Sequence, residues 1–209
     1  GDYVKKSLKL SFCLALFVAI IGNQHDYIYY LRQWKIVLSG ADPWIGTTNA
    51  YGPIHNVFAP LTLISPFIPK LIFFLCFVYS LYLVSFKPLL IDKDITHNLK
   101  HLSFGLFCFC PFSIITVALY GNNDSIVAAF MVIALFSTLS FPRRQADLIS
   151  GVFLAISSMI KFYPLLLIPT FIFHNRSINF NFLKIFSSTF ISISVVAYAL
   201  WGKSIFIPL

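Results

Sequence analysis

Glutamate is absent from this chain of 209 residues, and all seven of its acidic side chains are aspartates. Charged residues make up only 11% of the sequence, whereas soluble globular domains contain about 25%. Hydrophobic residues make up 58%, and the mean hydropathy is +0.84. So few charges cannot cover the surface of a soluble protein of this size, and the composition therefore predicts an integral membrane protein.

The fifteen basic residues give a net charge of +8 but form no basic stripe with interleaved aromatic residues. They lie in short connections between apolar runs, where membrane orientation places them, so no nucleic-acid partner is expected.

The four cysteines do not indicate a chemical role. Cys13, Cys76, Cys108 and Cys110 all lie inside apolar runs, and their spacing indicates neither a disulfide framework nor a zinc site.

Long apolar runs are abundant, and they predict an all-α fold, which is one polytopic transmembrane helical bundle over residues 1–209. The chain is expected to be a short protein or the amino-terminal portion of a longer one. The runs that we expect to enter the bilayer are residues 8–22, 71–86, 102–119, 126–141, 148–173 and 185–200. Pro111 predicts a kink in one of them. Lys161 and Pro164 interrupt 148–173, which is therefore expected to form two short helices.

The only long polar segment between these runs is a first outer loop at residues 23–53. Tyr27, Leu31, Trp34 and Leu38 recur at helical spacing and predict an interfacial helix over about 26–39, which Gly40 ends. Residues 54–68 are apolar but are cut by several prolines, so we expect a broken, interfacial or re-entrant piece on the same side of the membrane.

Charge supports this topology. With the amino terminus inside, ten basic residues fall on inner segments and five on outer segments, in agreement with the positive-inside rule. Asp26, Asp42, Asp124 and Lys161 then share the non-cytoplasmic face of a bacterial inner membrane or of the endoplasmic reticulum. A carboxylate and a cation there suit a transfer from a lipid-borne phosphate, because the carboxylate can accept a proton and the cation can stabilise the leaving phosphate.

The polar motifs also resemble those of a known group of enzymes. Asp26-Tyr27, Gly40-Ala41-Asp42-Pro43-Trp44, Tyr51-Gly52-Pro53, Gly121-Asn122-Asn123-Asp124-Ser125 and Lys161-Phe162-Tyr163-Pro164 occur in the order found in membrane glycosyltransferases of the C superfamily (GT-C), and especially in its mannosyltransferase branches. These enzymes take a sugar from a polyprenyl or dolichyl phosphate. The resemblance implies an inverting transfer of mannose to a lipid or glycan acceptor.

The resemblance also implies roles for individual residues. Asp26 would be the catalytic base, and Lys161 would lie near the donor phosphate. The substrate-binding residues would be Lys161, Tyr163, Asn122, Asp124, His25 and Tyr51. A divalent metal held by His25, His55 and Asp26 is an alternative, but these residues lack the spacing of metal ligands, so no metal site is expected. No cofactor is expected besides the lipid-linked donor.

The sequence departs from this pattern at three points. Gln24 occupies a position that is often acidic in the superfamily, Gly52 replaces proline or threonine, and the chain is about half the usual length. Membrane lipids and a second subunit that completes the site are therefore expected partners. Two alternatives remain: a transporter or lipid flippase, in which an intramembrane lysine lines a substrate path, and a non-catalytic subunit or fragment. Asp124 as a helix cap and Asp42 as a turn former are the structural alternatives at those positions.

Overall fold

The computed structural model describes residues 5–7, 9–11, 13, 14, 17, 22, 26–47, 49–86, 102, 104–106, 110–174 and 177–208. These residues fold into two compact units, which are described separately below. Unit 1 comprises residues 1–31 and 61–129, and unit 2 comprises residues 32–60 and 130–209. The predicted first span, residues 8–22, lies largely outside the described residues.

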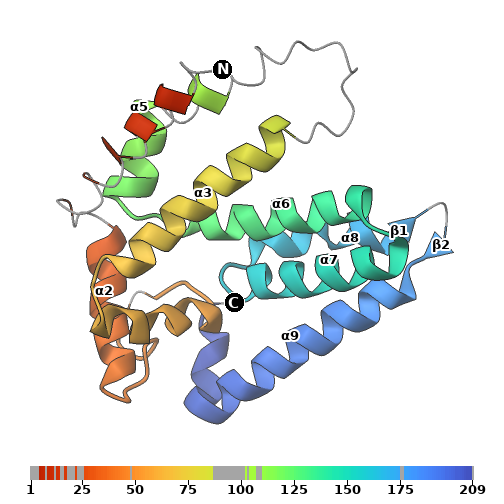
Figure 1. Cartoon of the computed structure of the whole chain (residues 1–209). Coiled ribbons are helices and arrows are strands. Elements are labelled where there is room, and N and C mark those ends of the chain that lie inside the picture. Colours follow the sequence, from red (N-terminus) through yellow and green to blue (C-terminus); the bar gives the residue numbers. More distant parts are fainter. Residues whose placement is uncertain are drawn as a thin grey trace. The chain divides into compact units, whose positions relative to one another are not determined.

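Helices account for nearly all of the described structure (Figure 1). In chain order the elements are α2 (Asp26–Leu38), η1 (Pro53–Leu63), α3 (Ile68–Phe86), α5 (Pro111–Ser113), η2 (Ile114–Leu119), α6 (Asp124–Ser140), α7 (Arg143–Ser158), η3 (Tyr163–Leu167), α8 (Ile168–Ile172), β1 (Phe173–His174), β2 (Ser177–Ile178), α9 (Phe180–Trp201) and η4 (Gly202–Phe206). The mostly helical fold and the bounds of the helix at Asp26 agree with the predictions from sequence.

Two details differ from the predictions. β1 and β2 pair antiparallel, so the fold is not purely helical. Pro111 begins α5 instead of kinking a long helix, and the following residues form a π-helix, η2. The apolar segment from Pro53, in contrast, agrees with the predicted piece interrupted by prolines: it is a 3-10 helix, η1, that contains Pro60. At about 2 Å of rise per residue, its 11 residues are too short to cross a hydrocarbon layer of about 30 Å.

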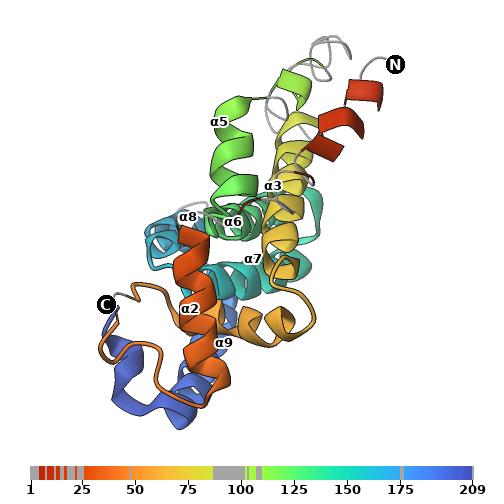
Figure 2. The ribbon, with the colours of Figure 1, turned by 90° about the vertical axis from the view of Figure 1, so that its left-hand side faces the viewer.

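Unit 1 has its core between α3 and the helix formed by α5 and η2, which Figure 2 shows running alongside each other. Phe74, Val117 and Ala118 are buried there. The first part of α2 joins this unit through Tyr27 and Tyr30, both of which are buried. The core of unit 1 therefore fixes the start of α2, where Asp26 lies.

Unit 2 is built on α7 and α9, which run side by side (Figure 1). Gly151 allows this contact, because a Cβ there would lie 2.8 Å from Cγ2 of Ile185. A row of stacked rings from Phe171 through Phe182 and Phe186 to Phe190 fills the core, with centroids 5.1, 6.0 and 5.8 Å apart. This packing buries apolar surface, and the geometry of the stacked rings favours one arrangement of the core side chains.

Two described helices are long and apolar enough to cross a membrane, within Ile68–Ser85 and Phe180–Phe206. The core helix of a soluble protein would be mostly buried, but only 33% of the first span and 11% of the second are buried. The shorter helices α6 and η3–α8 are also apolar. The predicted break in residues 148–173 is confirmed, because α7 ends at Ser158 and η3 begins at Tyr163.

Candidate active site

The best-formed constellation of predicted site residues lies in unit 2, where Tyr51 precedes η1 and Lys161 follows α7. The two segments are joined by backbone hydrogen bonds from Gly52 N to Ile160 O (2.9 Å) and from Ile54 N to Met159 O (3.1 Å). A Cβ on Gly52 would lie 2.2 Å from the carbonyl oxygen of Met159. Glycine is therefore required here, and this accounts for the departure from the usual proline or threonine in this chain.

Lys161 lies over an aromatic platform. Its Nζ is 5.3 Å from the centroid of the Tyr51 ring, and the Tyr51 ring is 4.6 Å from that of His55. The Trp34 ring lies 5.1 Å beyond His55, and its Nε1 donates a hydrogen bond of 2.9 Å to His55 O. Trp34 and His55 are fully buried, whereas Tyr51 and Lys161 are half-buried. The cation therefore stands at the accessible end of a stack anchored in the core.

The electrostatics of this stack leave Lys161 as its positive group. Burial, and to a smaller extent the charge of Lys161, lower the pKa of His55 to about 3, so that its imidazole is neutral at physiological pH. A cation over a tyrosine face is stabilised by the ring quadrupole. A half-buried ammonium group of this kind suits a phosphate or a developing anionic oxygen.

The loop before Tyr51 is fixed by the Asp42 turn. Trp44 N donates to Asp42 Oδ1 at 2.9 Å, so the structure supports Asp42 as a turn former. Trp44 Nε1 in turn donates to Tyr51 O at 3.0 Å, and the Trp44 ring packs edge-on against Trp201, with centroids 5.5 Å apart. The position of Tyr51 thus depends on α9 as well as on the strand-like contact with Met159 and Ile160.

Asp26, Asn122 and Asp124 lie in unit 1. Asp26 is the exposed first residue of α2, and α2 packs directly on the polar segment 121–124. Tyr30 OH donates to Asn123 Oδ1 at 3.3 Å, and a Cβ on Gly121, whose φ is +61°, would lie 2.5 Å from the Tyr27 ring. The structure thereby brings the helix of Asp26 onto the motif that contains Asn122 and Asp124.

The side chain of Asn122 accepts a hydrogen bond from Asp124 N at 2.9 Å, which forms a turn at the start of α6. Asp124 is half-buried in the first turn of that helix. Tyr163, in contrast, is 43% exposed at the start of η3. His25 lies outside the described residues. Whether Asp26 and Lys161 share one pocket stays a prediction, because they belong to different units.

Several residues of these constellations were not predicted from sequence. His55 and Trp34 form the buried end of the stack in unit 2. In unit 1, Lys70 is fully buried, its Nζ donates to Gly22 O, and it lies 5.2 Å from the Tyr27 ring centroid. Tyr27 OH donates to Pro66 O, and burial raises the pKa of this phenol. The only sequence signal for Lys70 was an isolated lysine between a proline and an apolar run.

An apolar groove of about 290 Å³ begins beside the stack, at Pro53 and Ile54. It continues between η1 and α9, where its lining residues are Val57, Ser192, Ile193, Val196, Ala197, Leu200 and Trp201. Its lining is almost entirely hydrocarbon, so it suits a lipid chain rather than a sugar or a phosphate.

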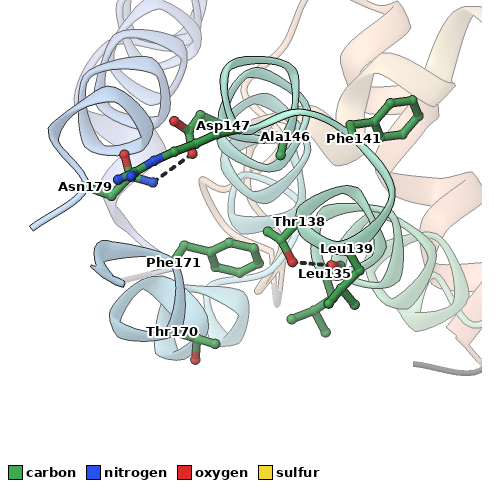
Figure 3. Close-up of a pocket in the computed structure, with 10 residues that line it drawn as sticks. Leu135, Thr138, Leu139, Phe141, Ala146, Asp147, Thr170, Phe171 and Asn179 are labelled. Carbon is green, nitrogen blue, oxygen red and sulfur yellow. Dashed lines mark hydrogen bonds between the residues drawn. The ribbon is translucent and has the colours of Figure 1, made fainter. Parts of the chain in front are cut away.

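A second cavity in unit 2, of about 360 Å³, lies between α6, α7 and α8 (Figure 3). Asn179 Nδ2 donates to Asp147 Oδ1 at 2.7 Å, a bond marked by a dashed line in Figure 3. Asn179 Oδ1 accepts from Phe182 N at 3.2 Å. Asn179 therefore caps α9 and ties it to α7. None of the predicted site residues lines this cavity, and its polar pair has a structural role.

Metal ligation finds no support in the described part of the chain, where no three His, Cys, Asp or Glu side chains form a group that could hold an ion. The class of protein defined by these features is a helical membrane protein with a cationic, aromatic candidate site beside an apolar groove.

Residues 50–206 match the model of glycosyltransferase family 87, and the chain belongs to that family. The matched segment contains Tyr51, Asn122, Asp124, Lys161 and Tyr163 but begins after Asp26. No curated protein and no solved structure gives a significant match. Family and exposed apolar helices together indicate a membrane-embedded glycosyltransferase.

Proposed function

We propose that this chain transfers a sugar, most simply mannose, from a polyprenyl-phosphate donor to a lipid or glycan acceptor on the non-cytoplasmic side of a membrane. The observation that carries the proposal is the half-buried Lys161 ammonium, 5.3 Å from the Tyr51 ring and next to an apolar groove. A lipid-linked phosphate needs both a cation for its head and an apolar path for its chain. The family supplies the reaction class, glycosyl transfer.

In the proposed reaction the carboxylate of Asp26 takes the proton of the acceptor hydroxyl. The acceptor oxygen attacks the anomeric carbon from the face opposite the phosphate and forms the new glycosidic bond. The bond between the anomeric carbon and the phosphate oxygen breaks, and its electron pair leaves with the polyprenyl phosphate. Lys161 stabilises the charge that gathers on this leaving group. One inversion at the anomeric carbon results.

The remaining predicted residues have supporting roles in this proposal. Tyr51 presents a flat face beside Lys161 and keeps the cation in place. Exposed Tyr163 contacts the donor head, and the polar segment that holds Asn122 and Asp124, with His25, contacts sugar hydroxyls. The donor and the acceptor are the substrates, and membrane lipids surround the chain. No metal takes part in the proposed transfer.

The test is sugar transfer by the purified chain in liposomes that contain radiolabelled polyprenyl-phosphate mannose and an extract of candidate lipid acceptors. Asp26→Asn is expected to reduce transfer by about 10²–10⁴-fold and Lys161→Met by about 10²–10³-fold. Lys203→Met removes an exposed cation from η4 and is the matched control, which is expected to retain activity. Equal transfer by wild type and Asp26→Asn would contradict the assignment of the base.

The same vesicles separate the alternatives. A flippase would move labelled polyprenyl phosphate between leaflets without transferring its sugar, and that movement would depend on Lys161 but not on Asp26. A chain that lacks its acceptor half would become active only after addition of the partner subunit, and Asp26→Asn would then abolish the restored transfer. Transfer that is independent of both residues would exclude the proposed site.

A further inference from the structure

A third groove in unit 2 is lined by residues of different chemistry from those that line the apolar groove and the cavity described above. It is a groove of about 440 Å³ between α7 and α9, and the residues that line it are Arg144, Leu148, Val152, Asn181, Lys184, Ile185, Ser188 and Thr189. Two of these are cations, three carry neutral polar groups, and three are aliphatic. None of the described residues that line the groove is acidic, so the net charge of its lining is positive.

The lining side chains change along the groove, from cations at one end to aliphatic side chains farther along. Arg144 lies in the first turn of α7 and Lys184 near the start of α9, so both cations lie toward the amino-terminal ends of their helices. The contacts of Asp147 with Asn179 and of Gly151 with Ile185 show that the two helices run in parallel, with both starts at one end. Leu148 and Val152 follow Arg144 by one and two turns, which continues the groove with aliphatic side chains toward the middle of α9.

The groove is exposed where a lipid would meet it. Arg144, Lys184 and Leu148 are all exposed, and only 11% of the apolar span that begins at Phe180 is buried. Asp147, the carboxylate closest to Arg144 in sequence, adds no charge to this groove's lining, because it accepts a hydrogen bond from Asn179 and lines the separate cavity of Figure 3. It therefore leaves the two cations available to a ligand from the membrane.

We infer that this groove binds an anionic phospholipid. The lipid phosphate lies between Arg144 and Lys184, and one acyl chain lies along Leu148, Val152 and Ile185. Charge complementarity selects an anionic head, because a zwitterionic head such as phosphatidylcholine adds a third cation to the site. Basic pockets between membrane helices on the cytoplasmic side are suited to anionic lipid heads, and the charge pattern predicts that Arg144 and Lys184 are on that side.

The inference does not depend on the proposed catalytic role of Asp26 or Lys161. It assigns the chain a lipid ligand at the end of α7 opposite Lys161, since Lys161 follows the carboxyl end of that helix. A bound lipid would also stabilise the contact between α7 and α9, on which the core of unit 2 is built.

Native mass spectrometry of the purified full chain tests the inference, with phosphatidylglycerol and phosphatidylcholine of identical acyl chains as probes. Wild type is expected to bind phosphatidylglycerol about ten- to thirtyfold more tightly, from two basic groups near one phosphate. The double variant R144Q/K184Q is expected to lose this preference. R143Q/K203Q, which removes two other exposed cations, is the matched control and is expected to keep it.

Two outcomes would overturn the inference. An equal loss of preference in both double variants would mean that net charge, not the groove, attracts the lipid, and retention by R144Q/K184Q would place the lipid elsewhere. The variant V152F fills the aliphatic part of the groove without a change of charge and is expected to weaken phosphatidylglycerol binding. Unchanged lipid binding by V152F would show that the site accepts only a phosphate group. Thermal unfolding in detergent confirms that each variant is folded.

Discussion

At the scale of single residues, burial sets the charge of His55 in the stack of Lys161, Tyr51, His55 and Trp34. The imidazole is fully buried and shares the Tyr51 ring with the Lys161 ammonium. A second positive charge there would lack solvent and would repel Lys161. Lys161 is half-buried, at the accessible end of the stack. The stack therefore contains one basic group besides His55, the Lys161 amine, because burial keeps the His55 imidazole neutral.

This arrangement makes stability depend on pH. The pKa of His55 is about 3 in the folded chain and about 6.5 in an unfolded one, so below pH 6.5 the unfolded state binds the additional proton. Folding stability is full above pH 6.5 and falls as the pH decreases toward 3. Between pH 6.5 and 5 the expected loss is about 2 kcal/mol. Thermal unfolding in detergent at the two pH values measures it.

His55→Gln is the control for this dependence, because it removes the titrating group and keeps a neutral polar side chain. The variant is expected to unfold at similar temperatures at pH 6.5 and pH 5, apart from shifts due to carboxylates. An undiminished pH dependence in His55→Gln would show that another group titrates.

At the scale of secondary-structure elements, η1 links the polar stack to the apolar groove. It is a 3-10 helix, with Pro60 inside it and Gly52 just before it, and its amino end is hydrogen-bonded to Met159 O through Ile54 N. One side of η1 buries His55 and Asn56, and the other exposes Val57 to the groove shared with α9. This short helix therefore places the stack of Lys161, Tyr51 and His55 next to the apolar groove.

Val57→Asn tests the role of this groove in donor binding. An amide placed among hydrocarbon side chains is expected to raise the KM for a long-chain polyprenyl-phosphate sugar about tenfold, because its desolvation is not repaid. The kcat is expected to change little, since Val57 does not contact the reacting atoms. A short-chain donor that does not reach the groove serves as the control substrate and is expected to show an unchanged KM. A similar increase for both donors would contradict binding of the chain there.

Sequence predicted the elements best where a local signal marks their ends. Asp26 and Gly40 bracket α2, and Lys161 with Pro164 marks the break after α7. The conformation of η1 was not predictable, because it depends on the close approach of Gly52 to Met159, over a hundred residues away. The stacking of Trp34 on His55 also arises from a tertiary contact, which apolar periodicity does not encode. The pairing of β1 with β2 is local, but two residues a strand are too few to show an alternating pattern.

At the scale of the whole molecule, the family gives the reaction class, whereas the membrane topology decides which residues can meet the substrate. Asp26, Asn122 and Asp124 gather in unit 1, and Tyr51 and Lys161 gather in unit 2. The order of their motifs along the chain predicted one shared site, which stays a prediction, because no spacing rule predicts how two compact units assemble. A site that uses residues from both units requires both groups to face the same side of the membrane.

Cysteine labelling tests the side on which the site lies. Ala50 and Gln145 are both exposed; Ala50 directly precedes Tyr51, and Gln145 lies in the first turn of α7. With the amino terminus inside, Ala50→Cys is expected to react with an impermeant maleimide added outside sealed vesicles of known orientation, and Gln145→Cys only after permeabilisation. The parent for both variants carries serine at the four native cysteines, so that each label has one site. Labelling of Gln145→Cys but not Ala50→Cys from outside would place Lys161 and Tyr51 on the cytoplasmic side, where the donor would have to be a lipid of the inner leaflet. That result would also move Arg144 and Lys184 away from the leaflet with the greater anionic charge, because both features depend on the same charge bias.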